Sequence, residues 1–394
     1  MSNDLAVRRD VPAGQLPGRG TGGWTTVPRD DVSDRTSDEK GFPEMARAGR
    51  FSGIHRTSVD IEDASLVTRT PGTDGAPTMV SASIAGLDLG HWLSAHRALL
   101  EDALTATGAV VLTGFAGAES EHALQASLDR AGRRTMRYVE RSTPRRQVAR
   151  DVYTSTEYPA NQEIALHCEL TAALEIPGHV WFICLERPGS GGETPVADTR
   201  AVLAGIPGDL AEEFRTKGWR LVRNYGTGFG PGWQEAMQSD SQAEVEEYFR
   251  KNAIEWQWMD GGRLRTEQIR NAIEVHPRTG EEVWFNHVVF WHDSALEPNV
   301  RAQMVRELGA DGLPYQVSFG NGQAIPAEAI QVIQRAYRTA LRERPWRDGD
   351  IMIVDNLLSA HGRRPFTGKR KIVVAMTDPT VRRPHPGGRP GNAP

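Results

Sequence analysis

A histidine and a glutamate stand two residues apart in the segment IALHCEL, residues 164–170. Alternate side chains of a β-strand point to the same face, so a strand here would project His167 and Glu169 together and turn Cys168 away. An imidazole beside a carboxylate suits a divalent transition metal. His-x-Glu pairs also occur without a metal, because exposed glutamates and half-buried histidines are common. A third ligand is needed to support the hypothesis.

The candidate third ligand, His361, lies far along the chain. Residues 350–355 have the composition of a buried strand, and a polar loop that contains His361 is predicted to follow it. Two imidazoles and one carboxylate on one face of Fe(II) leave the other coordination positions open for substrate and dioxygen. A solvated turn formed with Gly362 and Arg363 is the alternative for His361. The residue types allow a metal centre of His167, Glu169 and His361, and more residues are needed to decide between the two interpretations.

Further motifs occur in a fixed order around these ligands. They are TSTEYP at 154–159, HCE at 167–169, GGETPVAD at 191–198, WFN at 284–286 and HGRRPFTGKR at 361–370. Together they resemble the taurine dioxygenase-like family of Fe(II)/2-oxoglutarate oxygenases. Within that family they are most similar to the branch of syringomycin-type amino-acid β-hydroxylases. The resemblance covers residues from about 80 to 379.

This resemblance implies a mainly β fold with peripheral helices, a double-stranded β-helix of the jelly-roll or cupin-like type. It implies Fe(II) as cofactor, with 2-oxoglutarate and O₂ as co-substrates that yield succinate and CO₂. By motif, Thr194 and Arg370 would bind the distal carboxylate of 2-oxoglutarate, where a guanidinium offers a two-pronged match that a hydroxyl supplements. Without the motif, Arg370 is a surface cation beside Lys369 and Lys371, and Thr194 is a turn residue.

Glu169 stands where most of the wider family has aspartate. Glutamate is found there in the amino-acid hydroxylase branch, whereas related halogenases carry a small residue that admits halide. The carboxylate therefore favours hydroxylation, or another oxidation such as desaturation, over chlorination. The predicted substrate is an amino acid with an unactivated C–H bond, free or bound to a peptidyl carrier protein, in secondary-metabolite biosynthesis. The alternatives are a zinc hydrolase or cupin-like isomerase with the same ligands, and a degenerate barrel without turnover. A hydrolase does not need the dicarboxylate site of Thr194 and Arg370, and a degenerate barrel does not need to retain three metal ligands.

Glu157 and Arg363 are the candidate substrate-binding residues, for an amine and a carboxylate respectively. Either could equally be a scaffold residue in an exposed ion pair or a loop anchor. Arg223 and Asn224, at the end of a predicted strand, are weaker candidates.

Other histidines and aromatic residues are predicted to be structural. We expect His287 and His292 in the pocket wall or core, and His179 at a strand edge. The aromatic residues around Trp256 and in the cluster 284–291 are predicted to be core or interface residues rather than a cage.

Short strands separated by turns dominate the second half of the chain and must position these residues. Strands are predicted at 108–114, 164–170, 179–185, 219–224, 254–259, 263–269, 272–276, 281–289, 350–355 and 371–377, with hairpin turns at 260–262 and 277–280. Helices are predicted at 91–104, 123–131, 209–216, 244–252 and 327–342. This pattern favours a closed or double-sheet β architecture over alternating βαβ units.

Composition bounds the remaining possibilities. Basic and acidic residues number 46 and 51, so the net charge of −5 is too mild to suggest a nucleic-acid partner. No apolar run is long enough to span a membrane, and we expect a cytoplasmic protein with a small-molecule substrate. The sequence leaves open a homo-oligomer. Segments without apolar periodicity predict disordered tails at 1–78 and 380–394, which flank an oxygenase domain at 79–379.

Overall fold

Eight strands form the larger of the two sheets that carry the site in this computed structural model, which describes residues 66–140, 146–155 and 158–388. Their order is β1-β2-β3-β18-β8-β21-β5-β4, and only β2 and β3 pair in parallel. The strands are β1 (Val67–Thr70), β2 (Thr78–Ala82), β3 (Ala109–Thr113), β4 (Gln147–Ala149), β5 (Val152–Thr154), β8 (His179–Glu186), β18 (Ile351–Asp355) and β21 (Lys371–Thr377). The central strands β3 and β18 each begin with four apolar residues in a row, because both faces of these strands are covered.

A smaller sheet with the order β17-β10-β19-β6 faces the larger one. Its strands are β6 (Ile164–His167), β10 (Val196–Asp198), β17 (Leu341–Arg342) and β19 (Ser359–Arg363). One hydrophobic core contains Phe182 and Met352 of the larger sheet together with Val196 and Ala360 of the smaller one. Two sheets that share a core in this way form a double layer, as expected from the strand pattern.

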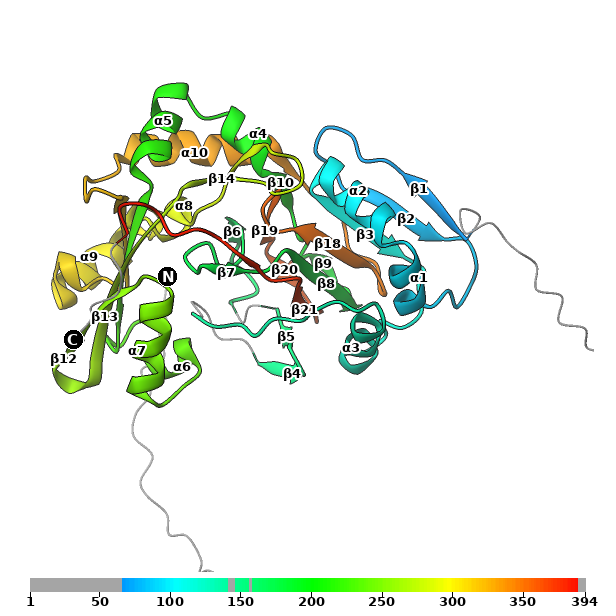
Figure 1. Ribbon diagram of the computed structural model, residues 1–394, viewed down its shortest axis with the longest axis horizontal. Helices are drawn as coiled ribbons and strands as arrows, with labels where there is room; N and C mark the ends of the chain where they lie inside the picture. Colours follow the sequence, from blue (N-terminus) through cyan, green and yellow to red (C-terminus); the bar gives the residue numbers. More distant parts are fainter. Residues whose placement is uncertain (1–65, 141–145, 156–157, 389–394) are drawn as a thin grey trace, which may run out of the picture. The chain divides into compact units, whose positions relative to one another are not determined.

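Three helices cover the other face of the larger sheet (Figure 1). They are α1 (Leu89–Ala95), α2 (Arg97–Thr107) and α3 (Glu121–Arg130), and their side chains share a second core with Trp181 and Ile353. The predicted single helix at 91–104 is divided at His96, whose backbone angles leave the helical region. Because α1 and α2 connect the parallel strands β2 and β3, the fold contains one βαβ unit, which the sequence pattern did not predict.

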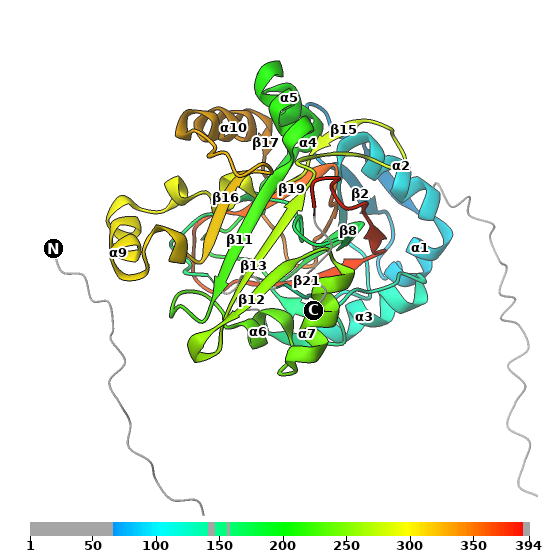
Figure 2. The ribbon, with the colours of Figure 1, turned by 60° about the vertical axis from the view of Figure 1, so that its left-hand side comes forward.

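A third sheet borders the site (Figure 2). Its strands run side by side in the order β12-β13-β11-β16, with bounds Glu255–Met259, Arg263–Arg270, Trp219–Tyr225 and Tyr315–Phe319. The predicted hairpin at 260–262 is confirmed, since Met259 pairs with Arg263 and Gly261 and Gly262 supply positive φ angles. Helices α6 (Trp233–Met237) and α7 (Gln242–Lys251) share a small core with this sheet.

The remaining elements complete the surroundings of the sheets. They are α4 (Thr199–Ala204), α5 (Gly208–Lys217), α8 (Val288–Trp291), α9 (Pro298–Leu308), α10 (Ala327–Ala340), β7 (Glu175–Ile176), β9 (Ser190–Gly191), β14 (Ile273–Val275), β15 (Glu282–Trp284), β20 (Phe366–Thr367) and β22 (Thr380–Val381). The predicted strand at 281–289 ends at Trp284. Asn286 stops it, because its side chain binds Ala272 O and the amide of Val288 and so starts α8.

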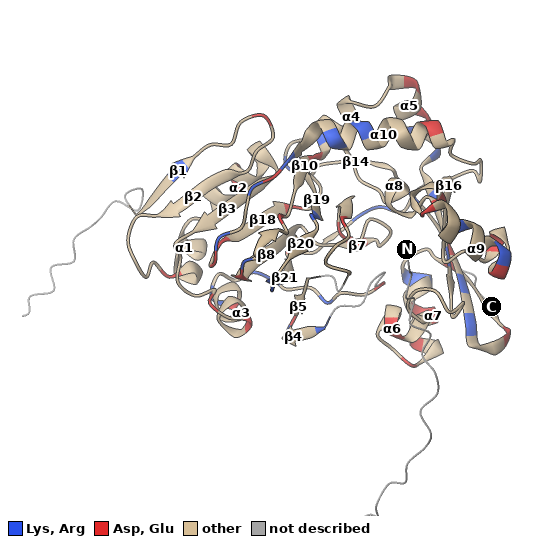
Figure 3. Ribbon diagram, turned by 180° about the vertical axis from the view of Figure 1, so that it is seen from behind, with Lys and Arg blue, Asp and Glu red and all other residues tan. Residues whose placement is uncertain are grey.

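Charged residues lie on the outer helices α7 and α9, whereas strands β2 and β3 carry none (Figure 3). None of the helices within the described ranges could span a membrane.

The fold extends beyond the predicted domain bounds at both ends: β1 pairs with β2, and the buried Arg382 donates to Thr171 O at 2.9 Å. The predicted tails are wrong in these segments, and residues 1–65 and 389–394 lie outside the described residues.

His179 begins strand β8, as predicted, and is also the centre of a buried ion network. Its ring nitrogens lie 3.0 Å from Asp378 and 3.4 Å from Glu101, and Arg133 bridges both carboxylates at 2.9 and 2.8 Å. Burial alone would lower the pKa of His179, but the bonds to Asp378 and Glu101 outweigh it and raise the pKa to about 9. The same contacts overcome the effect of burial on Glu101 and lower its pKa to about 2.

We expect His179→Gln to remove a pH-dependent part of the stability. The folded-state pKa of about 9 exceeds the usual 6.5, so protonated His179 stabilises the fold fully below pH 6.5 and less as the pH rises through 9. The pKa difference limits this effect to about 3 kcal/mol. Urea unfolding of the wild type between about pH 6 and pH 9.5 should show the loss, and the variant should respond much less. The exposed His122→Gln should match the wild type, and equal pH slopes in all three proteins would contradict the assignment.

Candidate metal centre and adjoining pockets

His167 and His361 face each other across neighbouring strands of the smaller sheet. His167 is the last residue of β6, and the antiparallel register pairs it directly with His361 of β19. Their ring centroids are 4.7 Å apart. Directly opposed residues of antiparallel strands project from the same face. The pairing of two strands that are distant in sequence therefore brings both imidazoles to one place.

The predicted loop around His361 is in fact a buried strand. All five residues of β19 are buried, and the strand pairs with β10 on one side and β6 on the other. Its sequence, SAHGR, is typical of a loop because His361 and Arg363 line a cavity, whereas only Ala360 belongs to the hydrophobic core. Strand pairing fixes the position of His361 more firmly than a loop would.

Glu169 reaches the site through a turn instead of strand alternation. Strand β6 ends at His167, and Leu170 has a positive φ of 56°. The fully buried Asn356 holds the backbone of Glu169 in a two-bond clamp: its Oδ1 accepts from Glu169 N at 2.7 Å and its Nδ2 donates to Glu169 O at 2.9 Å. Cys168 points into the hydrophobic core, where burial raises the pKa of its thiol.

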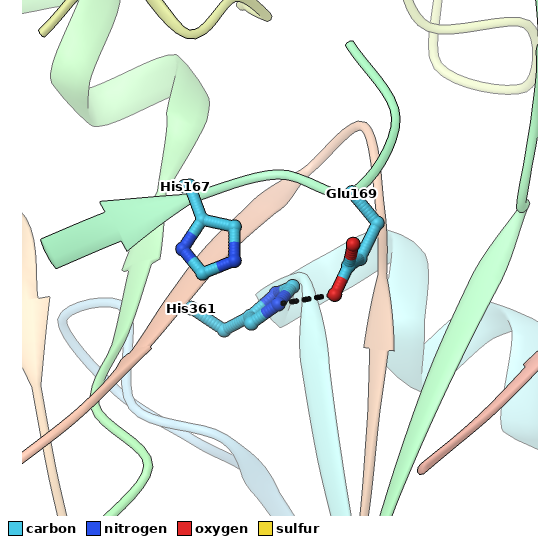
Figure 4. Close-up of side chains that lie close together, drawn as sticks. All are labelled: His167, Glu169 and His361. Carbon is cyan, nitrogen blue, oxygen red and sulfur yellow. Dashed lines mark ion pairs between the residues drawn. The ribbon is translucent and has the colours of Figure 1, made fainter. Parts of the chain in front are cut away.

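Figure 4 shows the side chains of His167, Glu169 and His361 converging. One ligand atom from each lies within 4.8 Å of the others, and His361 Nε2 is 3.6 Å from Glu169 Oε1. Among the described residues no other group of histidine, cysteine or carboxylate side chains gathers in this way. The structure thus brings together all three residues of the predicted centre.

The donor atoms fit a bound cation. Both ring nitrogens of His361 are buried without a hydrogen-bond partner among the described residues, which is costly unless another group satisfies them. His167 Nδ1 donates to Ala165 O at 2.8 Å, so in the neutral ring Nε2 carries the lone pair that can bind a metal. Two imidazoles and one carboxylate form the set expected for Fe(II) in an oxygenase.

His287 adjoins this group but is part of the pocket wall. Its ring centroid lies 5.6 Å from that of His167, its Nδ1 is hydrogen-bonded to Thr171 Oγ1, and it stacks on Trp291 at 4.3 Å. Burial, and then the neighbouring His167, hold the pKa of His287 well below its usual value. The ring is therefore neutral near pH 7, and its position agrees with the predicted wall or core.

Thr194 and Arg370 line a small cavity next to the two histidines. Arg370 donates to Gly192 O at 3.0 Å and to Ser155 Oγ at 3.3 Å, and Thr194 Oγ1 accepts from Trp346 Nε1 at 3.3 Å. The cavity measures about 30 Å³, which is room for roughly one water molecule.

Arg370 is a half-buried cation suited to an anion. Burial, and then the nearby Arg363, lower the pKa of Arg370 to about 10, and no carboxylate of the described residues lies within ion-pair distance of it. Gly192 makes its position possible: this residue has a φ of 71°, and a Cβ atom there would lie 3.0 Å from Phe366 and 3.2 Å from Arg370.

The two candidate substrate residues have different outcomes. Arg363 donates to the carbonyl oxygens of Tyr158, Pro159 and Gln162 at 3.0, 2.6 and 3.0 Å, so the structure gives it the alternative role of loop anchor. Glu157 lies outside the described residues.

A second, larger cavity of about 710 Å³ opens on the other side of His167 and Glu169. Arg223, rated a weak candidate from sequence, lies on its wall, whereas Asn224 points to the other face and donates to Asp311 O and Leu313 O. Further lining residues include Glu140, Phe290, Trp291, His292 and Tyr315. Phe290 and Trp291, predicted as core or interface residues, are therefore pocket residues. Glu140, Tyr315 and Asn356 belong to no motif and were not predicted as site residues.

Asn356→Ala is expected to weaken metal binding without removing a ligand. The change frees the backbone of Glu169, and the loss of groups that orient metal ligands typically costs about 10- to 100-fold in metal affinity. Titration with Co(II) as a spectroscopic probe should show the effect. Asn224→Ala, which also removes an amide that binds backbone carbonyl groups, is the control and should keep wild-type affinity. Equal affinities in both variants would show that the clamp does not position Glu169.

Comparisons with known proteins show which family the chain belongs to. A family model described as "Taurine catabolism dioxygenase TauD, TfdA family" matches residues 69–376. The dapdiamide synthesis protein DdaC of Enterobacter agglomerans is 39% identical over 311 residues, covering 78% of this chain and 94% of DdaC. A clavaminate synthase-like protein of Arabidopsis thaliana is 25% identical over 318 residues, covering 76% of this chain and 92% of that protein. The crystal structure of PvcB from Pseudomonas aeruginosa matches 82% of this chain and 95% of its own, with a TM-score of 0.48 and 15% identity.

The chain belongs to the TauD, TfdA family. It is a 2-oxoglutarate-dependent dioxygenase, with Fe(II) as cofactor and 2-oxoglutarate and O₂ as co-substrates. The resemblance predicted from the motifs is confirmed, and the hydrolase, isomerase and non-enzymatic alternatives are set aside.

Proposed function

We propose that His167, Glu169 and His361 bind the Fe(II) ion and that Thr194 and Arg370 bind the distal carboxylate of 2-oxoglutarate. The observation that carries the proposal is the convergence of ligand atoms from three buried residues within 4.8 Å, beside a cavity that Arg370 lines. The two facing sheets around them are, in this proposal, the double-stranded β-helix.

The proposed reaction is the hydroxylation of an unactivated C–H bond of an amino acid in secondary-metabolite biosynthesis. When bound, the iron would supply activation of O₂, with one oxygen atom going to succinate as 2-oxoglutarate loses CO₂ and the other to the substrate. Glu169 supports hydroxylation, because a carboxylate fills the position that a halide would need. A relative named for dapdiamide synthesis supports a biosynthetic role.

The chain's own residues would bind and orient the reactants. The guanidinium of Arg370 would fix one end of 2-oxoglutarate while the other end meets the metal, so the co-substrate can sit in one orientation only. The larger cavity beside His167 would hold the amino-acid substrate, whether free or presented by a peptidyl carrier protein.

Anaerobic addition of Fe(II) and 2-oxoglutarate to the purified protein tests the proposal. We expect a weak visible metal-to-ligand charge-transfer band, followed on admission of air by succinate release that a suitable amino acid stimulates. Mass spectrometry of the product separates hydroxylation, which adds one oxygen atom, from desaturation, which removes two hydrogen atoms. A protein that binds Fe(II) but never forms the band with 2-oxoglutarate would contradict the proposed site.

A further inference from the structure

A stack of rings and one guanidinium runs along the wall of the large cavity. It begins with His287 beside His167 and continues through Trp291 at 4.3 Å and Tyr315 at 5.2 Å, with interplanar angles of 19° and 7°. It ends at Arg223, whose guanidinium carbon lies 5.2 Å from the ring of Tyr315 and 4.6 Å from that of Tyr225. Three rings therefore separate Arg223 from His167.

The third sheet holds Arg223 in this stack through its register. Arg223 of β11 pairs directly with Tyr315 of β16, and Tyr225 follows two residues later on the same face of β11. The guanidinium lies between two aromatic rings, an arrangement that favours a planar cation and limits its rotation. Arg223 is 3% exposed and still lines the cavity. The fold thus presents a fixed positive charge at one end of the pocket.

A carboxylate lies close to this cation. Arg223 Nη1 donates to the backbone oxygen of Glu140 at 3.3 Å, and the side chain of Glu140 accepts from Tyr248 and Gln268 at 2.8 and 3.4 Å. Glu140 also lines the cavity. This end of the pocket therefore carries both signs of charge, which complements an ammonium and carboxylate head group better than a dianion.

We propose that Arg223 binds the α-carboxylate of the amino-acid substrate, with Glu140 meeting its ammonium, so that the carbon oxidised at the metal lies far along the side chain. This inference rests on the proposed function and adds the orientation of the substrate. A carboxylate at Arg223 is three rings from the metal ligands, whereas the β-carbon of an amino acid is separated from its carboxylate by the α-carbon alone. The substrate is thus an amino acid with a long side chain, and oxidation at the β-carbon is disfavoured.

The volume of the cavity agrees with this orientation. Pockets for drug-sized ligands measure roughly 300–1,000 Å³, and this cavity measures about 710 Å³. A small free amino acid would leave most of this space to water. Trp291 and Tyr315 would instead pack along an extended side chain.

Binding to the anaerobic Fe(II) and 2-oxoglutarate complex of the full chain tests the inference. The probes are alanine, norleucine and Nε-acetyl-lysine, each with its α-carboxamide, and the readouts are calorimetry and the shift of the charge-transfer band. We expect affinity to rise with side-chain length and each carboxamide to bind on the order of 100-fold more weakly than its acid. Arg223→Gln should weaken the acids by a similar factor and abolish the difference between acid and carboxamide.

Two further variants keep the test decisive. Arg220→Gln changes an arginine on the opposite face of the same strand, where it pairs with Glu267, and should behave as wild type. If Arg223→Gln does not fold, Tyr315→Leu removes a ring that orients Arg223 and should also reduce the preference for acids.

The inference is overturned if Arg223→Gln, or Tyr315→Leu in its place, keeps the preference for acids. It is also overturned if alanine binds as tightly as Nε-acetyl-lysine, or if no acid binds although the band forms. Failure of the wild type to form the band contradicts the proposed function instead.

Discussion

His361→Ala is expected to abolish the charge-transfer band and all 2-oxoglutarate turnover. Changes to residues that only orient metal ligands cost about 10- to 100-fold in affinity, so loss of a ligand should reduce Fe(II) affinity by more than about 100-fold. His361 is buried in β19 with no hydrogen-bonded partner among the described residues, and the fold should therefore tolerate the smaller side chain. Anaerobic titration with Fe(II) and circular dichroism measure the two effects separately.

The matched control is His122→Ala, which removes an exposed histidine on α3. It should keep the band at wild-type intensity. A folded His361→Ala protein with an unchanged band would show that His361 is not a ligand, however close it lies to Glu169. His167→Ala is expected to behave as His361→Ala does, because the register of β6 and β19 makes the two rings equivalent neighbours of the site.

The metal ligands could be predicted from sequence because two of them lie close together in the chain. His167 and Glu169 are two residues apart, and a motif shared with a known family adds His361. Their geometry was not predictable in detail. The carboxylate arrives through a turn after β6, and Asn356, from the end of β18, holds that turn. Such a contact joins residues that are distant in sequence, and no local pattern indicates it.

Periodicity predicted most strands but not what lies against them. A strand was predicted at 219–224, and β11 (Trp219–Tyr225) confirms it. Only the pairing with β16 shows that Arg223 lies beside Tyr315 and faces a cavity. His179 illustrates the same limit: its position at the start of an apolar strand was predictable from sequence, but its ion network was not. The acidic partners that bury and charge it come from α2 and from the end of β21.

Short polar segments were the main source of error in the fold. The strand at 281–289 was predicted too long because Asn286 ends it through side-chain bonds to the backbone, an effect that hydrophobic periodicity does not register. The residues of β19 have the polar composition of a loop because their polar side chains line the site. Both errors occur next to the pocket, where local preference gives way to function.

Arg370→Met is expected to weaken 2-oxoglutarate binding by about 100-fold while leaving the fold at least as stable as the wild type. The loss of one partner of a buried charge pair costs about 2–5 kcal/mol in binding, and each 1.4 kcal/mol is tenfold. In the free protein the same guanidinium is half-buried, and partial burial, followed by the like charge of Arg363, lowers its pKa. Replacement by a flexible apolar side chain removes that unfavourable burial.

The two effects of this variant should move in opposite directions, which separates a co-substrate site from a structural role. Titration of the charge-transfer band gives the apparent dissociation constant of 2-oxoglutarate, and urea unfolding gives the stability. Arg364→Met is the control, since Arg364 is paired with Glu163 and Glu343 and should not contact the keto acid. A structural Arg370 would instead show lower stability with unchanged affinity, and that result would assign the distal carboxylate to another residue. In the wild type, binding of 2-oxoglutarate in the cavity beside Thr194 is also expected to increase the protection of strands β9 and β20 from hydrogen exchange.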